Sequence, residues 1–454
     1  MPSLLFREAL LPQGWARDVR IVLHDGHIAS VEPNATPEPA DERHGIGLAG
    51  MPNLHSHAFQ RGMAGLAERR GPSDDTFWTW REVMYRFALS MRPQDIEAVA
   101  AWLYVEMLEA GFTRVAEFHY LHHQPDGTPY ANIAEHAERI AAAADTTGIG
   151  LTLLPVFYAH GGFGGAPAAP GQRRFLSDVD GYARLLAASR RAVGGLPGAV
   201  VGIAPHSLRA ATPAELALIE PLAEAGPIHI HAAEQPREVA ECLAWSGARP
   251  VEWLLRERGA DARWCFIHAT HMTAAETSDM ARAGVVAGLC PLTEASLGDG
   301  IFNGAEYLAA GGHFGIGSDS HILIGVAEEL RQLEYAQRLR LTQRNVMTRA
   351  EGDSAGRTLY EAALLGGAQA CGAPAAALAP GAPADIVALD PAHPSLCGRQ
   401  GDALLDGWIF AARGSAVSAV WVAGRQVVRD GHHAARPAVL ARYRESLAWL
   451  MAQP

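Results

Sequence analysis

The stretch Gly50-Met51-Pro52-Asn53-Leu54-His55-Ser56-His57 is a short apolar segment that ends in two histidines separated by one residue. On a β-strand, residues i and i+2 point to the same face, so both imidazoles can reach one metal ion. So short a motif also occurs as two surface histidines near a turn. A metal site therefore requires further ligands elsewhere in the chain.

Eight apolar segments, the first of which ends in this motif, alternate with helical patterns through the middle of the chain. Their ranges are 53–57, 114–120, 151–158, 200–206, 228–231, 264–269, 285–290 and 314–319. Near-continuous apolar runs are typical of parallel strands buried on both faces. The alternation predicts an α/β fold, a (β/α)8 TIM-like barrel. A doubly wound open sheet is the main alternative, which is disfavoured because no GxGxxG follows an early strand.

Both ends of the chain contain short strand patterns and tight-turn signals such as Asp25-Gly26 and Asp430-Gly431. We expect one small β-sandwich domain built from both termini. Residues 1–48 form its first part, and residues 376–454 form its second part together with a C-terminal helix. Residues 49–375 form the metal-dependent barrel.

The composition excludes several classes of function. The net charge is −12 and there is no basic run, so neither nucleic acid nor an anionic membrane is an expected partner. All 37 basic residues are arginine, which excludes Schiff-base chemistry on a lysine. The five cysteines are scattered, no segment has the length of a membrane span, and no signal-peptide pattern is visible. The expected location is the cytoplasm.

Polar residues that can bind a metal end six of the eight apolar segments, at the side where a (β/α)8 barrel carries its active site. They are His55 with His57, His119 with Tyr120, His206, His229 with His231, His268, and Asp319. Neutral imidazoles and one carboxylate suit zinc with a position left open for water, although iron or manganese could replace zinc. We predict that His55, His57, His231 and Asp319 bind one metal ion, and that His229 lies deeper and packs.

The motifs resemble the amidohydrolase superfamily in order and over nearly the whole chain. They are residues 50–57, His231-Ala232-Ala233-Glu234, His268, Gly317-Ser318-Asp319 and residues 380–387. Binuclear members commonly use a carboxylated lysine at the end of strand four, where this chain has His206. The resemblance therefore implies a single metal ion, and the Glu234 position is similar to the deaminase branch, in which this glutamate shuttles protons.

Two longer segments, 55–65 and 204–210, are similar to the formimidoylglutamate deiminases of this superfamily. This resemblance implies hydrolysis of N-formimino-L-glutamate to N-formyl-L-glutamate and ammonia in histidine degradation, by a homodimer. The implied mechanism is attack of a metal-bound hydroxide on the formimino carbon. In it Asp319 accepts the proton of the water, His268 stabilises the attacking oxygen and Glu234 protonates the leaving nitrogen.

A dicarboxylate substrate calls for arginines, whose planar fork matches a carboxylate. Arg209 and Arg81 are the candidates, each with a solvated surface charge as the alternative. Gln60, Tyr120 and His206 are proposed polar contacts to the substrate. Their alternatives are a helix-start residue, a packing residue and a structural hydrogen bond, respectively.

Two other functions stay open. One is another mononuclear zinc aminohydrolase, acting on a nucleobase, a triazine or an adenosine-like compound. The other is a non-catalytic barrel that binds a metal or a ligand, which Glu234 and His268 argue against because neither is needed to hold a metal. The loop at residues 161–165 could be a mobile lid or a linker, and His271 and His321 have no assigned role.

Overall fold

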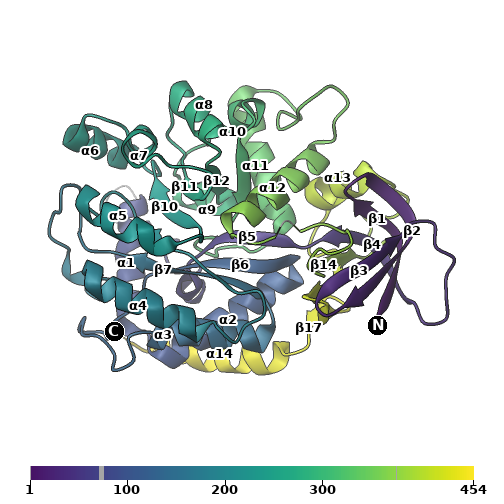
Figure 1. The fold of residues 1–454 in the computed structure, drawn as a ribbon, viewed down its shortest axis with the longest axis horizontal. Coiled ribbons are helices and arrows are strands. Elements are labelled where there is room, and N and C mark those ends of the chain that lie inside the picture. The colour runs from purple at the N-terminus through teal and green to yellow at the C-terminus, as the bar shows by residue number, and fades with distance from the viewer. Residues whose placement is uncertain (1, 71–75, 375, 454) are drawn as a thin grey trace.

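The structure is a computed structural model that describes residues 2–70, 76–374 and 376–453. Its centre consists of parallel strands in two sheets (Figure 1). The strands of the first sheet are β5 (Met51–Ser56), β6 (Phe112–His119), β7 (Gly150–Phe157) and β8 (Val200–Val201), with β9 (Ala204–Pro205) also paired to β7. The strands of the second sheet are β10 (Ile228–Ala232), β11 (Trp264–His268), β12 (Val286–Leu289) and β13 (His313–Ile316). Each of the eight predicted strand segments therefore contains an observed strand.

Isolated parallel bridges connect the two sheets at both edges. Ile203 pairs with Ile228 and Ser207 with His231 at one edge, and Ser56 pairs with Asp319 at the other. Because all these strands are parallel, their carboxyl ends meet on one side of the molecule.

The predicted strand over 200–206 is divided into β8 and β9. Between them, a Cβ at Gly202 would lie 2.3 Å from the carbonyl oxygen of Pro227, so only glycine fits this approach. The Ile203 N–H donates to the same oxygen at 3.0 Å, and the His229 N–H donates to the Ile203 carbonyl at 3.0 Å. The chain thus passes from pairing with β7 to pairing with β10.

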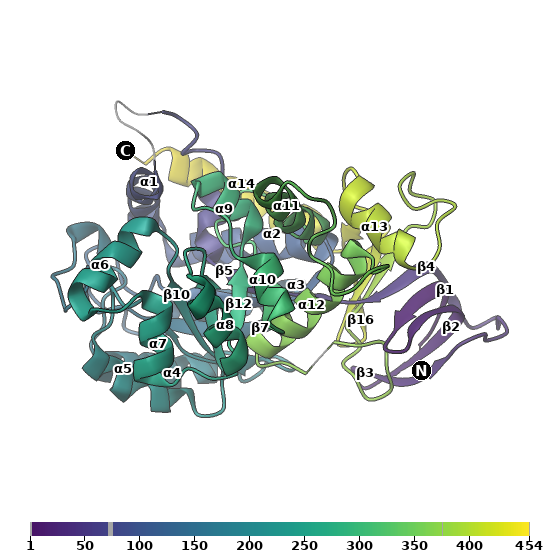
Figure 2. The ribbon, with the colours of Figure 1, turned by 90° about the horizontal axis from the view of Figure 1, so that it is seen from above.

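Helices follow most of the parallel strands along the chain and lie around them in space (Figures 1 and 2). Several begin at common helix-start residues: Pro93 opens the helix that runs to Glu109, and the Thr212 hydroxyl accepts from the Glu215 N–H. The helices are α1 (Phe77–Ser90), α2 (Pro93–Glu109), α3 (Glu135–Thr147), α4 (Val179–Ala192), α5 (Pro213–Ile219), α6 (Pro236–Ser246), α7 (Pro250–Arg258), α8 (Ala274–Ala283), α9 (Pro291–Leu297), α10 (Gly304–Ala309), α11 (Val326–Leu341), α12 (Ala355–Ala370), α13 (Asp402–Ala411) and α14 (Arg436–Met451), with 3-10 turns η1 (Ala58–Met63), η2 (Pro170–Gln172) and η3 (Glu220–Ala223).

The two ends of the chain meet in one eight-stranded sheet, at the right of Figures 1 and 2. Its order is β17-β16-β15-β14-β4-β1-β2-β3, and antiparallel pairing of β14 with β4 joins the two ends. The strands are β1 (Ser3–Leu11), β2 (Gly14–His24), β3 (His27–Glu32), β4 (Glu42–Ala49), β14 (Ile386–Leu389), β15 (Val417–Val422), β16 (Arg425–Arg429) and β17 (His432–His433). A sandwich arrangement of these strands stays a prediction, as do the domain boundaries.

Only Gly50 separates β4 from β5, so the sheet of the chain ends leads directly into the strand with the two histidines. A Cβ at Gly50 would lie 2.2 Å from the Thr113 hydroxyl, so this close crossing requires glycine. Within the described residues, no helix is long and apolar enough to cross a membrane.

Candidate metal centre and active site

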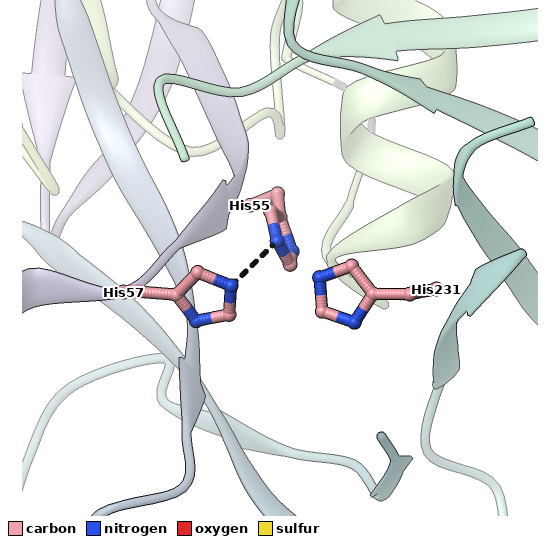
Figure 3. A group of neighbouring side chains, drawn as sticks. All are labelled: His55, His57 and His231. Atoms are coloured by element: carbon pink, nitrogen blue, oxygen red, sulfur yellow. Dashed lines mark hydrogen bonds between the residues drawn. The ribbon is translucent and has the colours of Figure 1, made fainter. Parts of the chain in front are cut away.

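Three imidazoles and one carboxylate converge at the carboxyl ends of the parallel strands. His55 lies in β5, His57 directly follows it, and His231 lies in β10 (Figure 3). Their ring centroids are 4.5–5.5 Å apart. Asp319 follows β13, and its Oδ1 is 3.6 Å from Nε2 of His55 and 3.4 Å from Nε2 of His57. The structure therefore brings together all four predicted metal ligands.

Backbone carbonyls determine which nitrogen of two of these rings carries the proton. His57 Nδ1 donates to the Phe118 carbonyl at 2.9 Å, and His231 Nδ1 donates to the His206 carbonyl at 2.9 Å. The Nε2 atom of each ring therefore keeps its lone pair, as metal-binding histidines require. Burial lowers the pKa of His57 to about 3 and the pKa values of His55 and His231 well below their usual value, so all three rings are neutral.

This donor set fits a divalent metal ion. Nε2 of His55 and Nε2 of His57 are 3.1 Å apart, and the Asp319 carboxylate faces both. Three imidazoles and one carboxylate are ligands that zinc accepts in catalytic sites. A cation between these atoms would satisfy lone pairs that otherwise face one another.

A buried polar network lies behind the ligands and includes His321, whose role the sequence left open. The His57 N–H donates to His321 Nε2 at 3.2 Å, which leaves His321 Nδ1 as the donor to the Ser318 hydroxyl at 2.9 Å. Asn53 Nδ2 donates to the same hydroxyl at 2.6 Å, and the Ser56 hydroxyl donates to Glu117 at 2.6 Å. The network ties β5 and β6 to the segment that carries Asp319 and so orients the ligands.

His268, Glu234 and Asp319 form a second polar group beside the ligands. His268 Nε2 is 3.8 Å from Glu234 Oε1 and 3.6 Å from Asp319 Oδ2. Burial raises the pKa of Glu234 above its usual value and raises that of Asp319 to about 7. Burial disfavours charge on His268, but Glu234, Glu294 and Asp319 outweigh it and raise the pKa of His268 to about 10. A metal ion bound by Asp319 would lower the Asp319 and His268 values again, because it adds positive charge.

Five non-glycine residues of this region adopt left-handed backbone conformations. The φ angles are 53° at Ala233, 68° at His268, 47° at Ala269, 43° at Asp319 and 58° at His321. Such conformations cost of order 1–3 kcal/mol each and persist where the surroundings enforce them, often at functional sites. Asp319 reaches its position after β13 has ended, where its backbone N–H donates to the His55 carbonyl at 3.1 Å.

One cavity opens onto these groups, and all five predicted substrate-binding residues line it. They are Gln60, Arg81, Tyr120, His206 and Arg209. Gln60 Nε2 donates to the Tyr120 hydroxyl at 2.9 Å. Burial lowers the pKa of His206 well below its usual value, so this ring is neutral beside the cavity.

Arg209 is buried, with 7% of its surface exposed. Its Nε and Nη1 atoms have no hydrogen-bond partner within the described part of the chain. Its Nη2 is 4.0 Å from Glu234 Oε2, and its guanidinium carbon is 5.7 Å from the centre of the Trp78 ring. Arg81 is half-buried and lies 4.8 Å from the centre of the same ring. Two guanidinium groups therefore stand at the cavity, one of them with unused donors.

Other histidines from the sequence analysis do not reach the cavity. His229 Nε2 donates to the Ala370 carbonyl at 2.7 Å, which agrees with its expected packing role. His119, at the end of β6, lies among the rings of His122 and His136 instead. His271 Nε2 donates to the Asp299 carbonyl at 2.7 Å.

The cavity also has an aromatic lining that was not predicted from the sequence. Phe77, Trp80, Tyr85, Tyr158 and Phe175 contribute to it. Three of them belong to α1 and Phe175 to the loop before α4, so only tertiary packing brings them to the strand ends.

The loop at residues 161–165 is closed by a bridge between Gly162 and Ala166.

Comparisons with known proteins agree with this geometry. Residues 46–427 match the model described as "Amidohydrolase family", and residues 5–45 match "Formimidoylglutamate deiminase HutF, N-terminal domain". A formimidoylglutamate deiminase from Pseudomonas aeruginosa is 53% identical over 436 residues, which cover 96% of each chain.

Solved structures also resemble the chain. An amidohydrolase from Brucella melitensis superposes with a TM-score of 0.97 at 58% identity and covers 100% of both chains. A zinc-bound adenosine deaminase from Xanthomonas campestris shares the fold, with a TM-score of 0.82 at 21% identity over 99% of this chain and 98% of its own. The amidohydrolase model matches the chain from β4 to β16, which is most of its length. The chain therefore belongs to the amidohydrolase family.

Proposed function

We propose that this chain hydrolyses N-formimino-L-glutamate to N-formyl-L-glutamate and ammonia, as a zinc-dependent deiminase. The observation that carries the proposal is Arg209, a buried arginine with unused donors in the cavity that contains Glu234 and the imidazole cluster. A buried guanidinium with free N–H groups is matched by an anionic ligand such as a carboxylate. The identity to the Pseudomonas aeruginosa deiminase and the match of residues 5–45 support the same substrate.

A zinc ion held by His55, His57, His231 and Asp319 would act as a Lewis acid and lower the pKa of water at the site. The reaction adds water to the formimino carbon and expels the terminal nitrogen as ammonia, so it needs a proton acceptor and a proton donor. Asp319 is the acceptor in this proposal, because its Oδ2 faces His268 while its Oδ1 faces the ligand rings.

Glu234 is the proposed donor to the leaving nitrogen. Burial raises its pKa, which favours the protonated carboxyl that a general acid requires. Neutral ammonia leaves far more readily than an amide anion, so this proton is chemically necessary. His268, between Glu234 and Asp319, is placed to donate a hydrogen bond to the attacking oxygen.

Arg209 and Arg81 are the proposed partners of the two substrate carboxylates. Arg209 is closer to the reacting groups, since Nη2 lies 4.0 Å from Glu234. Gln60, Tyr120 and His206 complete the polar contacts in this proposal. Aromatic side chains around them exclude water and strengthen these charge interactions.

The finer architecture belongs to the same proposal. The bridges at both sheet edges support closure of the parallel strands into a (β/α)8 barrel over residues 49–375. The joint sheet of the chain ends supports a β-domain from residues 1–48 and 376–454. A cytoplasmic homodimer acting in histidine degradation is the expected setting of the enzyme, and this expectation rests on the sequence and on its resemblance to the formimidoylglutamate deiminases.

The test is ammonia release by the purified, zinc-loaded protein from N-formimino-L-glutamate, compared with adenosine, S-adenosylhomocysteine, guanine and cytosine. We expect release from the first compound only. No release from N-formimino-L-glutamate would exclude the proposed substrate, and release from a nucleoside or a base would favour another aminohydrolase of this family.

A further inference from the structure

A second cluster of polar side chains lies behind the cavity, on the far side of His268 from the metal ligands. His268, Cys290 and Glu294 are all buried, and their polar atoms lie within 4.8 Å of one another. Glu294 lies in the first turn of α9, and Cys290 precedes this helix. The proposed mechanism uses only His268 of the three.

A backbone hydrogen bond at the start of its own helix holds the Glu294 carboxylate in place. Its Oε1 accepts the Cys290 N–H at 2.8 Å, across the start of α9. The same oxygen lies 3.2 Å from Nδ1 of His268. The backbone bond restrains the carboxylate, so the acceptor presented to the imidazole stays in place.

The opposite nitrogen of His268 faces the reacting groups. Nε2 lies 3.6 Å from Asp319 Oδ2 and 3.8 Å from Glu234 Oε1. The φ angles of His268 and Ala269 are 68° and 47°, so the chain turns out of β11 in a conformation that residues with a Cβ rarely adopt. A ring on such a turn needs a side-chain partner to keep its plane.

A second metal site at this cluster is the alternative interpretation, because imidazole, thiolate and carboxylate are all zinc ligands. Burial, with Asp319 and Glu294 nearby, raises the pKa of the Cys290 thiol well above its usual value, so a metal ion would have to displace a tightly held proton to bind the thiolate. The Nδ1 atom of His268 also already faces the carboxylate. The geometry is that of a hydrogen-bonded histidine.

We propose that Glu294 is the positioning residue of His268: its carboxylate accepts a hydrogen bond from the Nδ1–H group and thereby directs Nε2 toward the reacting atoms. The inference rests on the proposed function, because His268 meets the substrate only in that reaction. Glu294 does not line the cavity, so its effect passes through the imidazole.

The test compares Glu294→Gln with a matched control, Glu329→Gln. Glu329 is also buried, and it accepts a backbone N–H of α9, from Leu292 at 2.9 Å. Unlike Glu294, it makes no hydrogen bond to His268 within the described residues. We expect Glu294→Gln to lower kcat about 10- to 100-fold, as loss of a partner that orients a histidine does. In Glu294→Gln, KM and the zinc content should stay within about twofold of wild type, which we expect to hold one ion per chain. In Glu329→Gln, kcat should stay within about twofold of wild type.

A spectroscopic readout keeps the inference separate from the proposed function. In protein labelled with ¹⁵N-histidine, the Nδ1–H resonance assigned through His268→Asn should shift or vanish in Glu294→Gln and persist in Glu329→Gln. An unchanged resonance or an unchanged kcat in Glu294→Gln would overturn the inference. So would equal losses in both variants, or a second zinc ion that only Glu294→Gln removes. Failure of the proposed function would instead appear as a wild-type protein without ammonia release.

Discussion

Replacement of Arg209 by methionine should separate binding of the substrate from stability of the fold. Arg209 is 7% exposed, and its Nε and Nη1 atoms have no partner within the described residues. Each buried, unsatisfied donor costs about 1–3 kcal/mol. Attraction to Glu234 and Glu238 offsets part of this cost, and their negative charge raises the pKa of Arg209 even though burial opposes it. Without substrate, Arg209→Met should therefore be as stable as wild type or up to ~3 kcal/mol more stable.

Catalysis should change in the opposite direction. Loss of one partner of a buried charge pair costs about 2–5 kcal/mol, which corresponds to a fall in kcat/KM of about 30- to 5,000-fold. For a chain of 454 residues the thermal midpoint shifts by about 1 °C per kcal/mol, so we expect a change between 0 and about +3 °C. The assays are steady-state ammonia release and thermal unfolding of the substrate-free protein.

Arg237 provides the matched control, because its guanidinium also lies over Trp78, at 4.6 Å, but its side chain is 63% exposed. Arg237→Met should change kcat/KM by less than about threefold, as expected for an exposed charge. A thermal midpoint that falls by several degrees in Arg209→Met, with kcat/KM nearly unchanged, would contradict the proposed role of Arg209 in substrate binding. Arg209 would then be a structural residue.

Three further perturbations address the acid, the metal and the buried charges. Glu234→Gln should retain the metal and lower kcat by about 10²- to 10⁴-fold, measured by metal analysis and ammonia release; substantial turnover would exclude Glu234 as the proton donor. Removal of metal with a chelator should abolish turnover and zinc should restore it, whereas turnover in metal-free protein would contradict the assigned ligands. Burial raises the pKa of Asp299, and the negative charge of Glu234 raises it further. The folded state therefore holds a proton on Asp299 that the unfolded state loses above about pH 4. Wild type therefore loses stability as pH rises from there. Asp299→Asn should raise the thermal midpoint more at pH 8 than at pH 5, and an equal effect at both would contradict this.

The strand ends could be predicted from the sequence because their signal is local. Leu54, Phe118, Ile230 and Phe266 are apolar residues of buried strands, and the polar residue that follows each run stands out against them. The convergence of His55, His57, His231 and Asp319 then follows from parallel strands, whose carboxyl ends meet on one side.

The polar residues behind the ligands and behind His268 could not be predicted, because their partners are distant in the chain. Glu294 contacts His268 across 26 positions, and Ser56 contacts His321 across 265. Neither pair has a periodicity or a motif of its own. The division of strand four at Gly202 likewise depends on the approach of Pro227, which no local preference encodes.

His119 shows the limit of reasoning from strand ends alone. It closes an apolar run as His55 does, but it lies beside His122 and His136 instead of the cavity. Neighbouring residues of a strand point to opposite faces, so Phe118 and Tyr120 face the imidazole cluster while His119 faces the helices. Alternation distinguishes such residues once the inward face is known.

Product analysis of the wild-type reaction tests the central claim most directly. Proton NMR of the zinc-loaded protein with N-formimino-L-glutamate distinguishes which carbon–nitrogen bond breaks. With Glu234 protonating the terminal nitrogen, we expect N-formyl-L-glutamate and one equivalent of ammonia. Formation of L-glutamate and formamide, or no reaction, would contradict it.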